Sequence, residues 1–153
     1  MRGGGGHIMV WGMFSAAGVG PLVRIHGNLN SAKYLEILQT ELPPFFHQER
    51  NALFMQDNST PHTAAIVTNW MQQHGVERLP WPANSPDLNP LENLWAKMKR
   101  ALDTAGPMNN AEQAWQMVQL QWNRIPLPFI RQLITSMPRQ VAAVIAAQGR
   151  NTK

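Results

Sequence analysis

The sequence predicts a mixed α/β domain that ends in a run of helices, and three observations favour this class. Two short apolar segments, residues 8–14 and 21–26, are separated by Ser and Gly residues, which is typical of an antiparallel hairpin. A further apolar segment, residues 52–56, is followed by an acidic turn and then a helical pattern. From residue 90 onward, apolar side chains recur at helical spacing between Pro and Gly breakers.

The first elements are the hairpin and an amphipathic helix. We expect a hairpin loop longer than two residues, because a Ser and two Gly residues lie between the strands. Residues 31–42 place Leu and Tyr side chains at helical spacing, which predicts a helix. Asn30 or Ser31 can cap its start, and Pro43 with Pro44 is expected to end it.

The centre of the chain predicts a βα unit. The apolar segment after the first helix has the length of a buried strand, and Asp57 stands at its end. Thr60 as a cap and Pro61 in the first turn predict a helix that runs to His74. Residues 76–80 can form the next strand.

Helices are expected to fill the rest of the chain after a Pro-rich loop over residues 81–90. Asn89 as a cap, Pro90 at the first position and Glu92 at the third predict a helix to about residue 102. The further predicted helices are residues 111–122, 129–137 and 139–148.

Composition limits the class of protein. The 153 residues include 44% hydrophobic side chains, enough for the core of one domain. The absence of Cys excludes a disulfide framework and a thiolate zinc site. Because no apolar run approaches the roughly 20 residues of a membrane-spanning helix, we expect no membrane partner.

Basic side chains gather in the C-terminal third. Residues 1–96 contain five Lys/Arg and seven Asp/Glu, whereas residues 97–153 contain eight and two. This asymmetry suggests a polyanion partner, although a solvated helix surface explains it equally well. Lys99 follows Glu92 by seven residues and so shares its helix face. The candidate phosphate contacts are Lys97, Lys99, Arg100, Arg124, Arg131 and Arg139.

Asp57 and Glu92 are the candidate functional carboxylates, because each lies at the end of an element in a mixed α/β pattern. Carboxylate oxygens bind Mg²⁺, and two such ions can activate a water and stabilise the leaving oxygen of a phosphodiester. Structural roles stay open at this point. Glu92 can satisfy the backbone amide of Asn89, and Asp57 with Asn58 can stabilise a turn.

Three segments, in order, closely resemble the catalytic domain of Tc/mariner-type DNA transposases. They are residues 10–15 (VWGMFS), 54–64 (FMQDNSTPHTA) and 80–95 (PWPANSPDLNPLENLW). Between Asp57 and Glu92 lie 34 residues, the separation typical of the branch of this family whose catalytic triad ends in Glu. The resemblance predicts one partial catalytic domain over residues 1–153, with an α/β part at 8–103 and C-terminal helices at 107–148.

The resemblance implies an RNase H-like mixed sheet flanked by helices, and DNA strand cleavage and transfer by an Asp, Asp, Glu triad that holds two Mg²⁺ or Mn²⁺ ions. Asp57 would be the second ligand and Glu92 the third. Asn58, His62 and Asn89 would shape the site, although a His in the first turn of a capped helix is often purely structural. The implied partners are double-stranded DNA, both transposon ends and target, and a second copy or a full-length transposase. The implied location is the nucleus.

The sequence departs from the family pattern at the first catalytic Asp. In the family that residue lies on the opening strand, and here the only acids before Asp57 are Glu36, Glu41 and Glu49, none in a family motif. We therefore expect a sheet without its first strand, weak metal binding and no cleavage by this chain alone. Two alternatives stay open: a non-catalytic transposase remnant that binds DNA or another transposase copy, and a decayed reading frame whose product does not fold.

Overall fold

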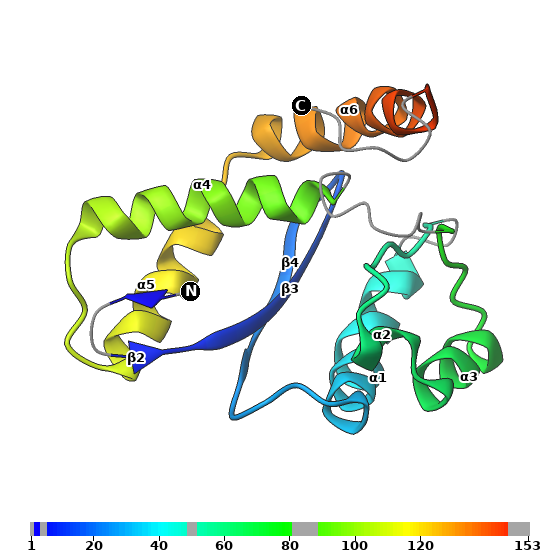
Figure 1. Ribbon diagram of the computed structural model, residues 1–153, viewed down its shortest axis with the longest axis horizontal. Helices are drawn as coiled ribbons and strands as arrows, with labels where there is room; N and C mark the ends of the chain where they lie inside the picture. The colour runs from blue at the N-terminus through cyan, green and yellow to red at the C-terminus, as the bar shows by residue number, and fades with distance from the viewer. Residues whose placement is uncertain (1, 4–5, 49–51, 81–88, 147–153) are drawn as a thin grey trace. The chain divides into compact units, whose positions relative to one another are not determined.

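The computed structural model describes residues 2–3, 6–48, 52–80 and 89–146 (Figure 1). The chain forms two compact units, residues 1–27 with 86–153 and residues 28–85. Most of the expected loop over residues 81–90 lies outside the described residues, as does the end of the last predicted helix. None of the described helices is long and apolar enough to cross a membrane.

A hairpin of β3 (Met9–Ser15) and β4 (Gly18–Ile25) is the centre of the first unit. Its turn has only two residues, so the expected longer loop is wrong. The turn closes tightly because the Ser15 hydroxyl accepts a hydrogen bond from the Ala17 N–H at 3.1 Å, and because Gly18, at φ 134°, enters the strand. The short strands β1 (Arg2–Gly3) and β2 (Gly6–His7) pair with each other.

The hairpin contains a bulge on β4. Gly12 pairs with Leu22 and Phe14 with Val19, so one residue of β3 faces two of β4. Pro21 is one of those two, and it has no N–H to donate to the ladder. A bulge is therefore where this proline is tolerated within a strand.

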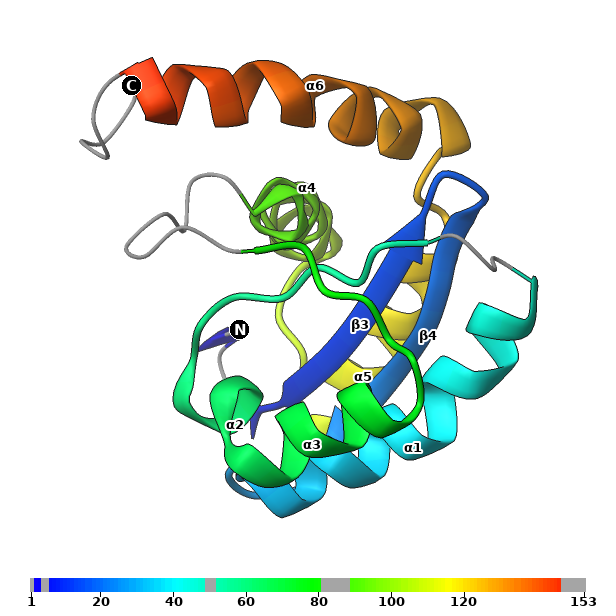
Figure 2. The same cartoon turned by 90° about the vertical axis from the view of Figure 1, so that its right-hand side faces the viewer.

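Three helices complete this unit: α4 (Pro90–Ala105), α5 (Ala111–Asn123) and α6 (Leu127–Ala146). Figure 2 shows α5 lying behind the hairpin, on one face of β3 and β4. The helices predicted over residues 129–137 and 139–148 are confirmed as helical to the end of the described residues, but the predicted break between them is wrong, because α6 continues through Pro138. The fixed φ of proline is compatible with a helix, and the missing N–H costs one hydrogen bond without ending this helix.

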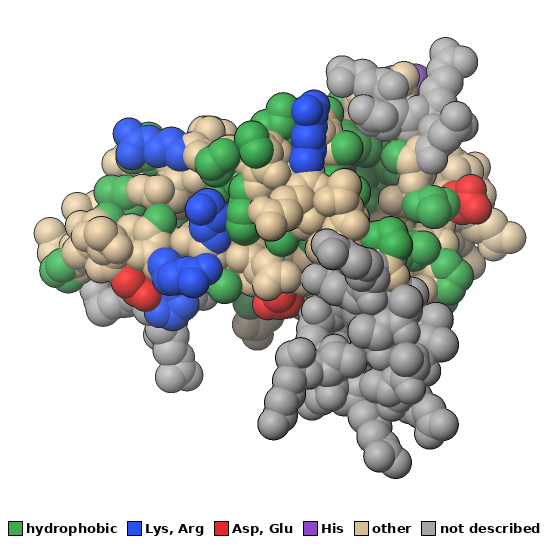
Figure 3. Space-filling model, turned by 90° about the horizontal axis from the view of Figure 1, so that it is seen from above, with side chains coloured by type: hydrophobic (Ala, Val, Ile, Leu, Met, Phe, Trp, Pro, Cys, Tyr) green, Lys and Arg blue, Asp and Glu red, His purple; other side chains and the backbone are tan. Residues whose placement is uncertain are grey.

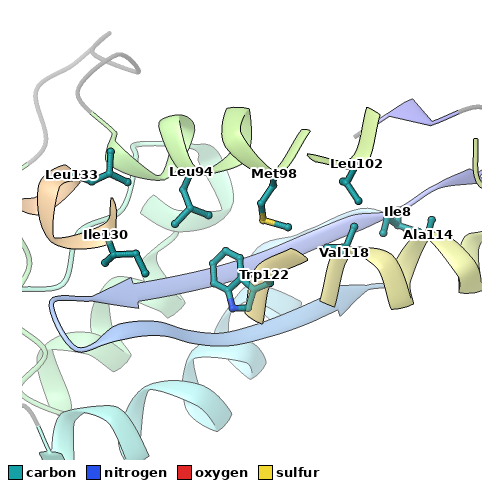
Figure 4. Packing of buried hydrophobic residues seen from close by; sticks show 9 residues of the cluster. All are labelled: Ile8, Leu94, Met98, Leu102, Ala114, Val118, Trp122, Ile130 and Leu133. Carbon is teal, nitrogen blue, oxygen red and sulfur yellow. The ribbon is translucent and has the colours of Figure 1, made fainter. Parts of the chain in front are cut away.

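The core of the first unit lies between the hairpin and these helices (Figure 4). Leu94, Met98 and Leu102 follow one stripe of α4 and are almost completely buried. Gly12 gives Trp122 its space, since a Cβ there would lie 2.8 Å from the indole ring. The indole N–H of Trp122 donates to the carbonyl oxygen of Gly20 at 2.9 Å. The cluster comprises Ile8, Leu94, Met98, Leu102, Ala114, Val118, Trp122, Ile130 and Leu133.

The second unit contains α1 (Ser31–Gln48), α2 (Thr60–Thr63) and α3 (Ala65–Gln73). Asn30 caps α1 as predicted, because its side-chain oxygen accepts from the Lys33 N–H at 2.9 Å. The predicted end of the helix at residue 42 is wrong, because α1 runs through Pro43 and Pro44. Proline φ fits a helix, and the helix packs through Leu38 and Leu42, which are fully buried. The buried apolar residues of this unit are Tyr34, Leu38, Leu42, Phe54, Val67, Trp70 and Met71.

The two predicted strands of this unit, residues 52–56 and 76–80, are reduced to one parallel bridge between Phe54 and Arg78. The Phe54 N–H donates to Glu77 at 2.8 Å, and the Leu79 N–H donates to the Phe54 carbonyl oxygen at 2.9 Å. Parallel pairing is slightly weaker per residue than antiparallel pairing and is normally part of a larger sheet. Residues 52–56 and 76–80, which pair in parallel only with each other among the described residues, therefore form a single bridge and not two full strands.

The helix predicted from Thr60 to His74 is divided in two. Ala64 is extended, with ψ 143°, and separates α2 from α3. The N-cap position belongs to Ser59, so the assignment of Thr60 as the cap is wrong. A side-chain hydrogen bond explains why the helix is interrupted between α2 and α3. The carbonyl oxygen of His62 accepts from the Gln56 side-chain amide at 3.0 Å. That carbonyl is thereby satisfied without the N–H that a continuous helix would supply.

Candidate functional site

Asp57 directly follows the bridge-forming segment of the second unit, and two donors converge on one of its carboxylate oxygens. The Ser59 N–H donates to Oδ1 at 3.0 Å, and Nδ1 of His62 lies 2.7 Å from the same oxygen. An ionised carboxylate can only accept hydrogen bonds, so Nδ1 carries the proton in this pair. The Asp57 side chain is 44% exposed, which leaves it accessible to a ligand.

The surroundings of Asp57 favour its charged form. Partial burial raises the pKa of Asp57, whereas the Ser59 N–H, the Ser59 hydroxyl and the facing His62 lower it. The lowering interactions outweigh burial, and the pKa lies below its ordinary value of 3.8. The carboxylate is therefore ionised at neutral pH, which is the form that binds a cation.

His62 is itself held by two residues that sequence reasoning did not assign to a site. The Tyr34 ring lies 4.1 Å from the His62 ring, centroid to centroid, at an interplanar angle of 33°. The Tyr34 hydroxyl donates to Gln56 Oε1 at 2.6 Å, and Gln56 donates to the His62 carbonyl oxygen. The apolar spacing that includes Tyr34 predicted a helix, but no local pattern connects Tyr34 with His62.

Asn58 lies next to Asp57 along the chain and is exposed. It lines an open pocket of about 540 Å³ within the second unit, together with residues of α3 and of the segment around Arg78. Its side chain therefore lies at the surface of the second unit.

Glu92 stands in the first turn of α4, in the first unit. Asn89 caps this helix as predicted, because its Oδ1 accepts from the Leu91 N–H at 3.0 Å and its carbonyl oxygen accepts from the Glu92 N–H at 3.0 Å. Pro90 and Leu94 are buried and anchor the turn. The Glu92 side chain is exposed and makes no hydrogen bond or ion pair with any other residue of the described segments. Its carboxylate thus lies at the surface of the described part of the first unit.

The basic residues expected on α4 already have partners in two of three cases. Lys97 Nζ lies 4.8 Å from the centroid of the Phe129 ring, and Lys99 forms an exposed ion pair with Asp103 at 2.7 Å. Arg100 is exposed. Figure 3 shows Lys and Arg side chains spread over one face of the molecule, some of them with an Asp or Glu side chain beside them.

The structure brings the predicted site residues together in two groups. Asp57 and His62 form one group, with Asn58 beside Asp57, and Asn89 and Glu92 form the other. The two groups belong to different units. Within the described segments, no three His, Cys, Asp or Glu side chains form a group that could hold a metal ion.

Comparison with known proteins identifies the family. The family described as "DDE superfamily endonuclease" matches residues 1–115. The Tcb1 transposase of Caenorhabditis briggsae is 39% identical over 155 aligned residues, and the Tc1 transposase of Caenorhabditis elegans is 40% identical over the same length. Each alignment covers 100% of this chain and 56% of the relative. The chain thus spans about half the length of these curated relatives.

Solved structures of Mos1 mariner transposase share the fold. The Mos1 catalytic domain with raltegravir and Mg has a TM-score of 0.82 at 23% identity, and the alignment covers 95% of this chain and 77% of that one. The Mos1 strand transfer complex has a TM-score of 0.84 at 24% identity, covering 95% and 44%. This likeness confirms the predicted RNase H-like α/β fold. Together with the sequence relatives it confirms the resemblance to Tc/mariner transposases, and the chain belongs to the DDE superfamily endonuclease family.

Proposed function

We propose that this chain is the catalytic part of a DNA transposase, which cleaves phosphodiester bonds and transfers the freed strand into target DNA. One observation carries the proposal: in a DDE-family fold, the Asp57 carboxylate is ionised, accessible and oriented by two donors on one oxygen. Mos1, which shares the fold, has been crystallised as a strand transfer complex. Strand transfer, the activity proposed for this chain, is consistent with its membership in the DDE superfamily endonuclease family.

The donor chemistry at both positions fits a hard divalent cation. Carboxylate oxygens are the ligands that Mg²⁺ and Mn²⁺ take, and both Asp57 and Glu92 present one at the surface. We propose these two residues as ligands of Mg²⁺ or Mn²⁺, the ions present in Mos1 catalytic-domain structures. Such an ion would supply activation of water and stabilisation of the leaving oxygen.

The remaining residues are proposed to position the ligands and the DNA. Ser59 and His62 hold the Asp57 carboxylate, and the Asn89 cap fixes the turn that carries Glu92. Asn58 follows Asp57 directly in the chain and is proposed to shape the same site. Lys97, Lys99 and Arg100 are proposed to contact phosphates of double-stranded DNA, and Lys99 would exchange Asp103 for a phosphate. We propose a second transposase copy as a protein partner and the nucleus as the location, because the DNA substrate lies there.

A chimera tests the proposed function. This chain would replace the aligned half of the Caenorhabditis elegans Tc1 transposase, and excision of a transposon reporter would be measured in cells. We expect excision by the chimera, and its loss in Asp57→Asn and in Glu92→Gln at equal protein level. Asn93→Ala, an exposed change one residue from Glu92, is the matched control. Excision that persists in both carboxylate variants would contradict the proposal.

The 153-residue chain alone is expected to leave supercoiled plasmid DNA intact in Mn²⁺. Two carboxylates supply fewer ligands than the three-carboxylate site of the family, so the ions would be weakly held. Agarose gels of plasmid incubated with purified chain check this expectation. Nicking that disappears in Asp57→Ala would contradict it, while binding of DNA without cutting would favour the remnant interpretation for the chain by itself.

A further inference from the structure

Tyr34 lies behind the Asp57 and His62 pair, although it comes from a different helix and from none of the three family-like segments. It is almost completely buried, with 1% of its surface exposed. A buried Tyr needs a hydrogen-bond partner for its hydroxyl. Tyr34 finds that partner in Gln56, the residue that precedes Asp57.

Tyr34 holds His62 in two ways. Its ring contacts the imidazole face at a centroid distance of 4.1 Å. Its hydroxyl fixes Gln56 at 2.6 Å, and the other end of the same Gln56 amide holds the His62 carbonyl oxygen at 3.0 Å. The ring and the backbone of His62 are therefore constrained from one side by a single tyrosine.

The contacts that Tyr34 and Gln56 make with His62 affect the orientation of the Asp57 carboxylate through one short hydrogen bond. His62 reaches Asp57 Oδ1 through Nδ1 at 2.7 Å, and its side chain is only 16% exposed. An imidazole that swings away from Tyr34 loses the aromatic contact and this hydrogen bond together. The tautomer of a His is set by the partner of its ring nitrogens, so the geometry requires the proton on Nδ1.

We infer that Tyr34 is a positioning residue, which holds His62 so that His62 in turn fixes the orientation of the Asp57 carboxylate. The inference rests on the proposed function to the extent that Asp57 binds a cation. Its closest physical analogy is the outer shell of metal sites, where residues that orient a ligand affect metal affinity without touching the ion.

The test uses the purified 153-residue chain and ¹⁵N spectra of its His side chains at about pH 8, above the range in which His side chains change charge. His62→Gln identifies the His62 signals. Wild type is expected to show His62 protonated at Nδ1. Tyr34→Phe keeps the aromatic ring and is expected to keep this tautomer, whereas Tyr34→Leu removes the ring and is expected to lose it.

Mn²⁺ titration provides the second readout. Paramagnetic broadening of the amides around Asp57 gives an apparent affinity for each variant. Since loss of an outer-shell partner typically costs about 10- to 100-fold in metal affinity, and Tyr34 acts through His62, we expect a loss of about 3- to 10-fold in Tyr34→Leu. Tyr34→Phe is expected to stay within about 2-fold of wild type.

His74 is the internal control. It belongs to the same unit, stacks on Trp70 at a ring-centroid distance of 4.5 Å and bonds the Trp70 carbonyl oxygen through Nδ1 at 2.8 Å. Unchanged His74 signals show that the unit is folded. If Tyr34→Leu unfolds the unit, the wild-type chain and Tyr34→Phe still test the inference. A neutral His62 that is protonated at Nε2 in either of these two proteins overturns it.

The outcomes separate this inference from the proposed function. A Tyr34→Leu variant that keeps the His62 tautomer and the Mn²⁺ affinity overturns the positioning role. A His62 tautomer that depends on the Tyr34 ring, in a wild-type chain that shows no Mn²⁺ broadening, supports the positioning role and contradicts the metal-binding proposal.

Discussion

The two units present their carboxylates in opposite ways. Asp57 is held by its side chain, because Ser59 and His62 donate to its carboxylate. Glu92 is held only by its backbone, through the Asn89 cap and the buried stripe of α4, and its carboxylate has no partner among the described residues. Protein groups thus orient the Asp57 carboxylate, whereas the described residues include no such contact to the Glu92 carboxylate. Substitutions that loosen the packing of α4 should therefore change the position of Glu92. Substitutions that remove hydrogen bonds should change the orientation of Asp57.

The largest expected effect is on the packing that supports Glu92. Leu94 is fully buried in the core of the first unit, so Leu94→Ala should destabilise that unit by about 2–5 kcal/mol. Urea unfolding followed through the amide signals of α4 measures this loss. Asn93→Ala, on the exposed face of the same turn, is the control. A Leu94→Ala variant as stable as the control would contradict the description of the core.

A smaller effect is expected at the cap. Asn89→Ala removes the acceptor of the Leu91 N–H, which should cost about 1 kcal/mol of stability. Amide hydrogen exchange at Leu91 and Glu92 should become faster, because the first turn frays. If exchange at these two amides matched that of wild type, the Asn89 cap would have no part in positioning Glu92.

The pH dependence of the second unit should depend on Asp57. Its pKa is lowered in the folded chain, so its stabilising contribution is complete above the ordinary value of 3.8 and is lost as pH falls through the folded pKa. The effect should stay below about 1 kcal/mol, because the carboxylate is half-exposed. The urea midpoints of α1 and α3 amides, measured at pH 6 and at pH 3, test the sign of this pH dependence.

Asp57→Asn should reduce the pH dependence of the urea midpoint. Glu36→Gln, an exposed change on α1, is the control. An equally steep dependence in Asp57→Asn would show that another group causes it.

The smallest effect on stability is expected at Lys99. Its ion pair with Asp103 has 61% of each side chain exposed, so Lys99→Ala should change stability by less than about 0.5 kcal/mol. Its effect should instead be seen in DNA binding, where loss of one phosphate contact lowers the salt slope by about 1. Fluorescence anisotropy with duplex DNA over a range of salt measures the slope. Asp103→Ala removes the same ion pair but keeps the Lys99 cation, so a slope lowered equally in both variants would argue against a phosphate contact.

Local signals predicted much of this structure. Asn30 and Asn89 cap their helices as predicted, because a cap depends only on a side chain and the two or three N–H groups that follow it. The hairpin and the position of Asp57 after an apolar segment were also predicted, from spacing alone. The expectation that proline ends a helix was wrong at Pro43, Pro44 and Pro138. Packing keeps these helices intact, because each proline removes only one backbone N–H donor.

The rest depended on contacts between residues far apart in sequence. The division of the helix at Ala64 follows from the Gln56 side chain, which satisfies the His62 carbonyl oxygen. The spacing of Tyr34 predicted only that it lies on a helix, and its burial, its hydroxyl bond and its ring contact with His62 require the fold. The role of the two carboxylates stays a prediction from the sequence, while the network that orients Asp57 could be seen only in the fold.

The most direct test of the central claim is a Mn²⁺ titration of the amide spectrum of the 153-residue chain. If Asp57 and Glu92 are metal ligands, the amides around each residue should broaden, and Asp57→Asn and Glu92→Gln should each abolish the broadening around the substituted residue. Broadening that is indifferent to either substitution, or no broadening at all, would contradict the claim.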